Sequence, residues 1–141
     1  MDRSASAVWK GSLKEGKGTI STQSGVLKEA QYSFSTRFEN GIGTNPEELI
    51  AAAHAGCFTM ALSGQLTSAD LVPESLETTA VVTMEKTDAG FTVTKIHLTT
   101  KAKVPGADKA KFDELAGNAK KGCPISRLLK AAEITLDAQL V

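Results

Sequence analysis

The chain has 141 residues, and its 16 Lys and Arg residues balance its 16 Asp and Glu residues to a formal net charge of zero. This length predicts one domain over residues 1–141 with a hydrophobic core. The balanced charge argues against nucleic acid or an anionic membrane as a partner. The first residues lack the apolar core of a secretory signal, which indicates a cytoplasmic protein. In that reducing compartment, two cysteines are expected to be free, catalytic or redox-active.

The first third of the chain predicts β-strands separated by turns that contain glycine. We expect these strands at Ala7–Gly11, Thr19–Thr22 and Gln31–Phe38. Successive side chains of a strand point to opposite faces, so Arg37 falls on the polar face of the third strand.

A long helix should follow. Asn45 can cap it, Pro46 suits the first helical position, and Glu48 can complete a capping box. The helix should run to about Thr67, and because it is apolar on most sides we expect a buried central element. Its apolar run, Leu49–Leu62, is shorter than the ~20 residues that a bilayer requires.

The rest of the chain predicts a β-hairpin, two further helices and a last strand. The return strand of the hairpin changes the parity of its apolar residues, which predicts a bulge or a change of buried face. Strands grouped before and after helices, without strict alternation, indicate an α+β fold. The expected elements are strands at Leu76–Glu85 and Phe91–Val104, helices at Asp108–Lys121 and Pro124–Lys130, and a strand at Glu133–Leu140.

Two cysteines are the first candidates for chemistry. Cys57 lies in the apolar helix, where burial raises the pKa of a thiol and leaves it inert unless another segment supplies a cation. The alternative for Cys57 is a packing role, since free cysteine is among the most buried residues. Cys123 precedes Pro124 and can cap the short helix, where backbone N–H groups favour a thiolate. The alternative for Cys123 is an incidental turn position.

His54 stands three residues before Cys57, on the same face of the helix. A Cys57–His54 hydrolytic pair would lack an evident orienting partner. A metal site built from His54, Cys57 and Cys123 would lack a clear fourth ligand. We therefore interpret His54 as a histidine of the core, and His97, on a polar strand face, as a surface residue.

Arg37 and Glu47 flank one short loop. Each by itself is explained as a surface residue, and the helix N-terminus favours a glutamate there. Together they could form an ion pair, which would keep the guanidinium charged and fix its orientation.

Two stretches of the chain resemble the motifs of the OsmC/Ohr family of peroxidases. The first is Thr36–Glu39 followed by Gly43–Leu62, and the second is Ala119–Ser126. Two long motifs at the matching separation are specific, and the resemblance extends over nearly the whole chain. It implies an intertwined homodimer with active sites at the interface and organic hydroperoxides as substrates. It also implies an external dithiol reductant, of which dihydrolipoamide is an example, and no bound cofactor or metal.

The resemblance also implies roles for four residues. Cys57 would be the peroxidatic cysteine and Cys123 the resolving one, while Arg37 would be the activating cation and Glu47 its anchor. The arginine lies just before the Gly43–Glu47 stretch, as in the OsmC branch of the family. A Cys57 thiolate would attack the hydroperoxide to give a sulfenic acid, and Cys123 would convert this acid into a disulfide.

Helix geometry bears on which subunit supplies the arginine. Glu47 and Cys57 are ten residues apart, which is ~15 Å along a helix at 1.5 Å per residue. Arg37, if tied to Glu47, therefore cannot easily reach Cys57 of its own chain. We expect a partner helix, crossing at the face that carries Gly56 and Gly64, to deliver the arginine to the opposite cysteine.

Apolar side chains beside the cysteine, those of Leu49, Ile50 and Phe58, are expected to line a pocket that prefers alkyl peroxides. The competing function is non-enzymatic. It is a dimeric module that binds a small apolar ligand and uses both cysteines for packing.

Overall fold

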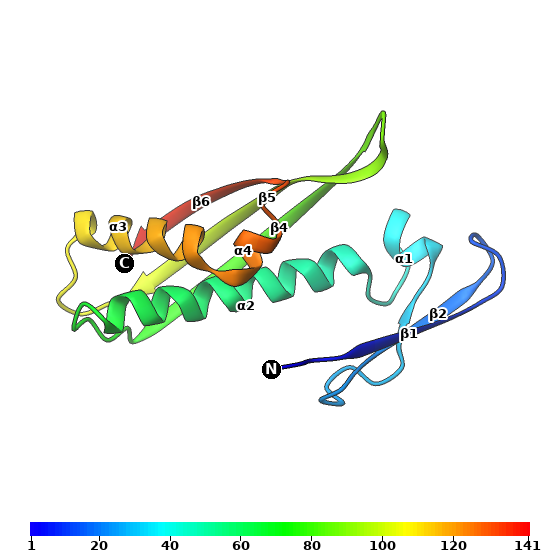
Figure 1. Ribbon diagram of the computed structural model, residues 1–141, viewed down its shortest axis with the longest axis horizontal. Coiled ribbons are helices and arrows are strands. Elements are labelled where there is room, and N and C mark those ends of the chain that lie inside the picture. Colours follow the sequence, from blue (N-terminus) through cyan, green and yellow to red (C-terminus); the bar gives the residue numbers. More distant parts are fainter. The chain divides into compact units, whose positions relative to one another are not determined.

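The computed structural model describes all 141 residues and contains two compact units, residues 1–49 and residues 50–141. We refer to them as the first and the second unit. Each contains a three-stranded sheet. Helices follow the first sheet along the chain, and further helices lie between the second and the third strand of the second sheet (Figure 1). The predicted α+β class is confirmed.

The sheet of the first unit is antiparallel, in the order β1-β2-β3. Its strands are β1 (Ala5–Lys10), β2 (Lys17–Thr22) and β3 (Ala30–Tyr32). Every residue of β1 is exposed, and β1 and β3 form the two edges of the sheet. The first two predicted strands are therefore confirmed within a few residues.

The predicted third strand, Gln31–Phe38, is wrong over most of its length. Residues Phe34–Phe38 instead form a short helix, α1, because two side chains close a capping box. The Thr36 N–H donates to Ser33 Oγ over 3.3 Å, and the Ser33 N–H donates to Thr36 Oγ1 over 2.8 Å. Such local hydrogen bonds compete with the ladder of a strand, and here they stabilise a helix although the residues alternate as in a strand. Arg37 therefore lies in the last turn of α1.

Helix α2 (Pro46–Thr67) has the predicted bounds. The side chain of Asn45 caps it, accepting a hydrogen bond of 2.8 Å from the Glu48 N–H. The predicted capping box is wrong, because the Glu48 carboxylate accepts from Thr44 Oγ1 over 2.8 Å. The Thr44 hydroxyl thus takes the place of the backbone donor that a capping box would use.

The sheet of the second unit has the order β4-β5-β6. Strands β4 (Ser75–Thr87) and β5 (Gly90–Lys103) form the predicted hairpin, and a register shift after Thr83 leaves Thr94 unopposed, which confirms the predicted bulge. Strand β6 (Glu133–Leu140) pairs with β5 in parallel. A parallel neighbour requires a crossover connection, and two helices supply it.

These connecting helices are α3 (Lys109–Gly122) and α4 (Pro124–Leu128). Asp108 caps α3 by accepting a hydrogen bond of 2.9 Å from the Lys111 N–H. Only Cys123 separates α3 from α4, and it serves both as the C-cap of α3 and as the N-cap of α4. The position of this cysteine is therefore set by the joint between two helices.

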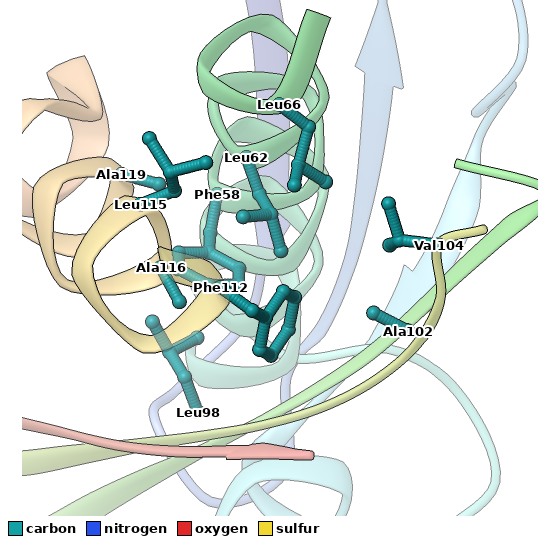
Figure 2. Close-up of a cluster of buried hydrophobic side chains, with 10 residues drawn as sticks. All are labelled: Phe58, Leu62, Leu66, Leu98, Ala102, Val104, Phe112, Leu115, Ala116 and Ala119. Atoms are coloured by element: carbon teal, nitrogen blue, oxygen red, sulfur yellow. The ribbon is translucent and has the colours of Figure 1, made fainter. Parts of the chain in front are cut away.

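The core of the second unit lies between α2, α3 and one face of the sheet (Figure 2). Helix α2 contributes a single buried stripe, with residues four positions apart. Burying each large side chain of such a stripe stabilises the fold by about 1.5–3 kcal/mol. The buried cluster consists of Phe58, Leu62, Leu66, Leu98, Ala102, Val104, Phe112, Leu115, Ala116 and Ala119.

The opposite face of α2 is open, so the prediction of burial on most sides is wrong for the single chain. Ala52, Gly56 and Gly64 are exposed, and Met60 has 78% of its surface exposed. A Cβ atom added at either glycine would meet nothing within 4 Å. By length and hydropathy alone α2 is long enough to cross a membrane, a criterion that core helices of soluble proteins also satisfy.

Candidate active site

Arg37 and Glu47 form the predicted ion pair within the first unit. Arg37 Nη2 lies 2.7 Å from Glu47 Oε1, and Arg37 Nε lies 3.1 and 3.2 Å from the two carboxylate oxygens. The arginine side chain is 38% exposed and the glutamate side chain 15%. The guanidinium also lies 5.3 Å from the centroid of the Phe38 ring. Two-point contact with a carboxylate fixes the plane of the guanidinium and leaves it partly exposed.

The loop between α1 and α2 is held in place by hydrogen bonds. Asn45 Nδ2 donates to the Thr36 carbonyl over 3.1 Å, and the Thr44 N–H donates to the Gln31 carbonyl over 2.8 Å. Gly43 has φ +144°, and a Cβ atom there would lie 2.6 Å from the Gln31 oxygen. The loop therefore requires glycine at this position, and its fixed shape brings α1 and the first turn of α2 together.

An apolar cavity of about 260 Å³ borders Arg37 in the first unit. The rings of Trp9 and Tyr32 lie 5.3 Å apart in its wall. Gly18 makes this packing possible, since a Cβ atom at this glycine would lie 2.3 Å from the Tyr32 ring. Sequence reasoning missed the cavity because its aromatic residues come from β1, β3 and α1. The full lining is Trp9, Leu13, Tyr32, Ser33, Phe34, Arg37 and Phe38.

The two cysteines meet in the second unit. Both are free, and a side-chain hydrogen bond joins Cys57 on α2 to Cys123 at the start of α4. The backbone N–H of Ile125 also donates to the Cys57 sulfur. Cys57 is partly exposed, whereas Cys123 is completely buried. Two thiols that are 66 positions apart in the sequence are thus neighbours in the fold.

The surroundings of Cys57 favour its protonated form. Burial raises the pKa of this thiol, the hydrogen bond with Cys123 and the charge of Cys123 raise it further, and the Ile125 N–H opposes the rise. No cation is among these contributions. A thiolate at Cys57 therefore needs a cation brought by another segment, as the sequence predicts. The Cys123 side chain, for its part, caps no backbone N–H of α4.

His54 belongs to the core, as predicted. Its ring is completely buried, Nε2 lies 2.7 Å from Ser126 Oγ, and Nδ1 has no hydrogen-bond partner. Burial lowers the pKa of His54, so the ring is neutral at pH 7. His97 is exposed, also as predicted, with Nδ1 2.6 Å from Thr135 Oγ1.

The geometry gives little support to a Cys57–His54 hydrolytic pair, to a metal site or to the predicted pocket lining. His54 Nε2 is engaged by Ser126 and Nδ1 has no hydrogen-bond partner, so neither ring nitrogen is bonded to Cys57. No group of three or more His, Cys, Asp or Glu side chains could hold a metal ion. The predicted pocket lining is wrong for Phe58, which is completely buried in the core (Figure 2), while Leu49 and Ile50 are half-buried.

A second cavity, of about 800 Å³, lies over the end of α3, α4 and the start of β6. Four cationic side chains and no acidic one line it, although the chain as a whole is neutral. Sequence reasoning missed it because these cations are spread over two helices and the loop after them. Such a lining favours an anionic group. The lining residues are Lys120, Lys121, Pro124, Ser126, Arg127, Leu128, Lys130, Ala132 and Ile134.

Comparison with known proteins gives consistent matches. Residues 38–138 match the family described as OsmC-like protein. The chain is 58% identical over 134 residues to peroxiredoxin OsmC of Escherichia coli (strain K12), covering 95% of this chain and 93% of the relative. It is 31% identical over 124 residues to the organic hydroperoxide resistance protein OhrB of Bacillus subtilis (strain 168), covering 87% of each.

Solved structures share the fold. The crystal structure of OhrB of Bacillus subtilis matches with a TM-score of 0.72 at 24% identity, covering 98% of both chains. That of an OsmC-like protein from Mycoplasma pneumoniae matches with a TM-score of 0.78 at 16% identity, covering 100% of this chain and 98% of the other.

Proposed function

The chain belongs to the OsmC family, and on that premise we propose that it reduces organic hydroperoxides to alcohols through a Cys57 sulfenic acid and a Cys57–Cys123 disulfide. It is a cysteine peroxidase. The observation that carries the proposed route is the contact between two cysteines that are far apart in the sequence. An incidental packing cysteine would have no reason to meet a second free thiol.

The proposed reaction has three steps. The Cys57 thiolate attacks the distal oxygen of ROOH, and the released alkoxide takes a proton to give ROH and a sulfenic acid on Cys57. The Cys123 thiol then attacks that sulfur, which forms the disulfide and releases water. An external dithiol finally reduces the disulfide by exchange and becomes a disulfide itself.

Arg37, oriented by Glu47, is proposed to activate Cys57. A cation within ~4–6 Å lowers the pKa of an acid by ~1–3 units, enough to make an ordinary thiol largely ionised near pH 7. The same guanidinium would stabilise the charge that develops on the leaving oxygen. The bidentate contact with Glu47 supports this role, since it holds the charge in one orientation.

We propose that the arginine acts across a homodimer. Glu47 and Cys57 are ten residues apart on one helix, ~15 Å by helical rise, so the ion pair of one chain suits the cysteine of a partner. The open face of α2 with Gly56 and Gly64 supports close approach of a second helix there. Exposed apolar surface of this kind marks an interaction site. The match with peroxiredoxin OsmC covers 95% of the chain and therefore includes both units, so we retain one OsmC-like domain over residues 1–141.

The proposed substrates are organic hydroperoxides rather than hydrogen peroxide. The aromatic cavity beside Arg37 supports this choice, because it offers an apolar surface next to the charge that would activate the reaction. Its volume of about 260 Å³ suits a small alkyl or aryl group. This cavity takes over the role that the sequence assigned to Leu49, Ile50 and Phe58.

The reductant is proposed to be an external dithiol such as dihydrolipoamide, in the reducing cytoplasm. Cys57 is partly exposed and Cys123 is completely buried. An incoming thiolate therefore attacks the Cys57 sulfur, which forms a mixed disulfide and releases Cys123 as a thiolate. The second thiol of the reductant then attacks its own mixed disulfide and releases Cys57.

A thiol count tests the proposed function. The reduced protein receives one equivalent of cumene hydroperoxide, and free thiols are counted before and after. We expect the loss of two thiols per chain without a crosslink between chains. A dimeric binding module with packing cysteines would lose none quickly, and that result would contradict the proposal.

A further inference from the structure

A buried hydrogen bond lies beside the two thiols, and the reaction proposed above makes no use of it. Nε2 of His54 on α2 lies 2.7 Å from Oγ of Ser126 on α4. The histidine is completely buried, and Ser126 is 5% exposed. The bond therefore joins the same two segments that carry Cys57 and Cys123.

On each of the two segments, the cysteine and the hydrogen-bonding residue are separated by the same number of positions. His54 precedes Cys57 by three residues, and Ser126 follows Cys123 by three. Residues three apart on a helix lie on one face, about 4.5 Å apart along the axis. Helix α2 and the Cys123–Ser126 segment are thus connected at two neighbouring points, once by imidazole and hydroxyl and once by thiol and thiol.

Helix α4 has few other means of holding its place. It is five residues long, and Ser126 is its one buried side chain. A helix of this length has no stability of its own. Since Cys123 alone joins α4 to α3, a small rotation at this joint would move the Cys123 sulfur away from Cys57.

The buried ring of His54 depends on Ser126 for its hydrogen bond. Because Nδ1 of the ring has no hydrogen-bond partner, the contact between Nε2 and Ser126 is the one hydrogen bond that the ring makes. A buried polar group that loses its partner is strongly disfavoured, which opposes any opening between α2 and α4.

We propose that His54 and Ser126 are positioning residues that hold the resolving Cys123 against Cys57 for disulfide formation. This inference depends on the proposed function for its biological meaning. Once Cys57 is a sulfenic acid, two reactions compete. Either the Cys123 thiol attacks it and water leaves, or a second hydroperoxide oxidises it to a sulfinic acid and is itself reduced to an alcohol. A fixed Cys123 favours the first.

The first experiment measures this competition by mass spectrometry. Protein is treated with excess cumene hydroperoxide, and the ratio of Cys57 sulfinic acid to Cys57–Cys123 disulfide is determined. Loss of one hydrogen bond should raise the ratio about tenfold in Ser126→Ala and in His54→Leu. Ser126→Thr and His54→Gln retain a hydroxyl and a polar group near Nε2, and they should stay close to the original ratio. Thermal unfolding of each variant verifies that it is folded.

The second experiment does not use peroxide. Each variant is equilibrated with glutathione redox buffers, which gives the effective concentration of the Cys57–Cys123 thiol pair. It should fall about tenfold in Ser126→Ala. The double variant His54→Leu/Ser126→Ala should be no worse than the more affected single variant, because both lose the same bond.

The outcomes separate the two proposals. If Ser126→Ala and His54→Leu match the unmodified protein in both measurements, the positioning role is overturned. It is also overturned if the effects of the two substitutions multiply in the double variant. If the unmodified protein forms its disulfide in glutathione but does not react with hydroperoxide, the proposed function fails, while the glutathione result still decides the role of His54 and Ser126.

Discussion

The two units of the chain carry different groups of the reaction that we propose. The first carries a half-exposed cation, Arg37, fixed by Glu47 beside an aromatic cavity. The second carries a thiol pair in apolar surroundings that raise the pKa of Cys57. A cation without a nucleophile and a nucleophile without a cation are each incomplete. The reaction that we propose therefore requires both the guanidinium of the first unit and the thiols of the second.

The substitution with the largest expected effect removes the nucleophile. Cys57→Ser should abolish turnover of cumene hydroperoxide with a dithiol reductant, since an alcohol at this position is a far weaker nucleophile than a thiolate. Cys123→Ser is the matched variant. It should consume one equivalent of hydroperoxide and then accumulate sulfinic acid on Cys57. Full multi-turnover activity in both variants would contradict the assignment of the two cysteines.

The substitution with the next largest expected effect removes the cation. Arg37→Met should lower the second-order rate with cumene hydroperoxide by about 10²–10³-fold, the usual loss for one charge-stabilising donor. The pKa of Cys57, followed by thiolate absorbance, should rise in this variant, so its rate should recover as the pH is raised. Glu47→Gln keeps the arginine but weakens its anchor, and it should show a smaller loss. An unchanged Cys57 pKa in Arg37→Met would exclude the guanidinium as the activating group.

Hybrid dimers sharpen the comparison. Subunits that carry Cys57→Ser and subunits that carry Arg37→Met are each inactive or nearly so. If the arginine acts across the dimer, each hybrid contains one intact site, and mixing the two variants should restore activity. If it acts within its own chain, no site in the hybrid is intact. Activity that stays at the level of the separate variants, despite subunit exchange, would place the arginine in cis.

A substitution in the aromatic cavity should have a smaller effect on activity. Phe34→Ala removes part of the apolar surface that we assign to the organic group of the substrate. The ratio kcat/KM for cumene hydroperoxide should fall about tenfold, while that for hydrogen peroxide should change little. Val26→Ala, at an exposed position of the same unit, is the control. Equal losses for both peroxides would mean that the cavity does not select the substrate.

The smallest effect concerns stability in acid. Burial lowers the pKa of His54, so the unfolded chain binds a proton there that the folded chain does not. The free energy of unfolding should therefore fall as the pH drops below about 6.5, by at most about 1.4 kcal/mol per pH unit. His54→Gln should remove this contribution, and the exposed variant His97→Gln should retain it. Denaturant titrations between pH 7 and pH 5 measure the difference; equal slopes in all three proteins would contradict the prediction.

Local sequence alone determined several elements. Helix α2 was predicted with its bounds because Asn45 and Pro46 specify its start through contacts within one turn. The hairpin and its bulge followed from side-chain parity, which is a property of the strand itself. The Arg37–Glu47 pair was within reach of sequence reasoning because its two residues flank a single short loop.

Tertiary structure alone decided the rest. Alternating residues favour a strand at Phe34–Phe38, yet side-chain hydrogen bonds make it a helix. Whether Phe58 faces the core or a pocket depends on where α3 and β5 pack. Similarly, the hydrogen bond from His54 to Ser126 spans 72 positions. Spacing along one chain segment does not encode such contacts, because they form only when distant elements pack against each other.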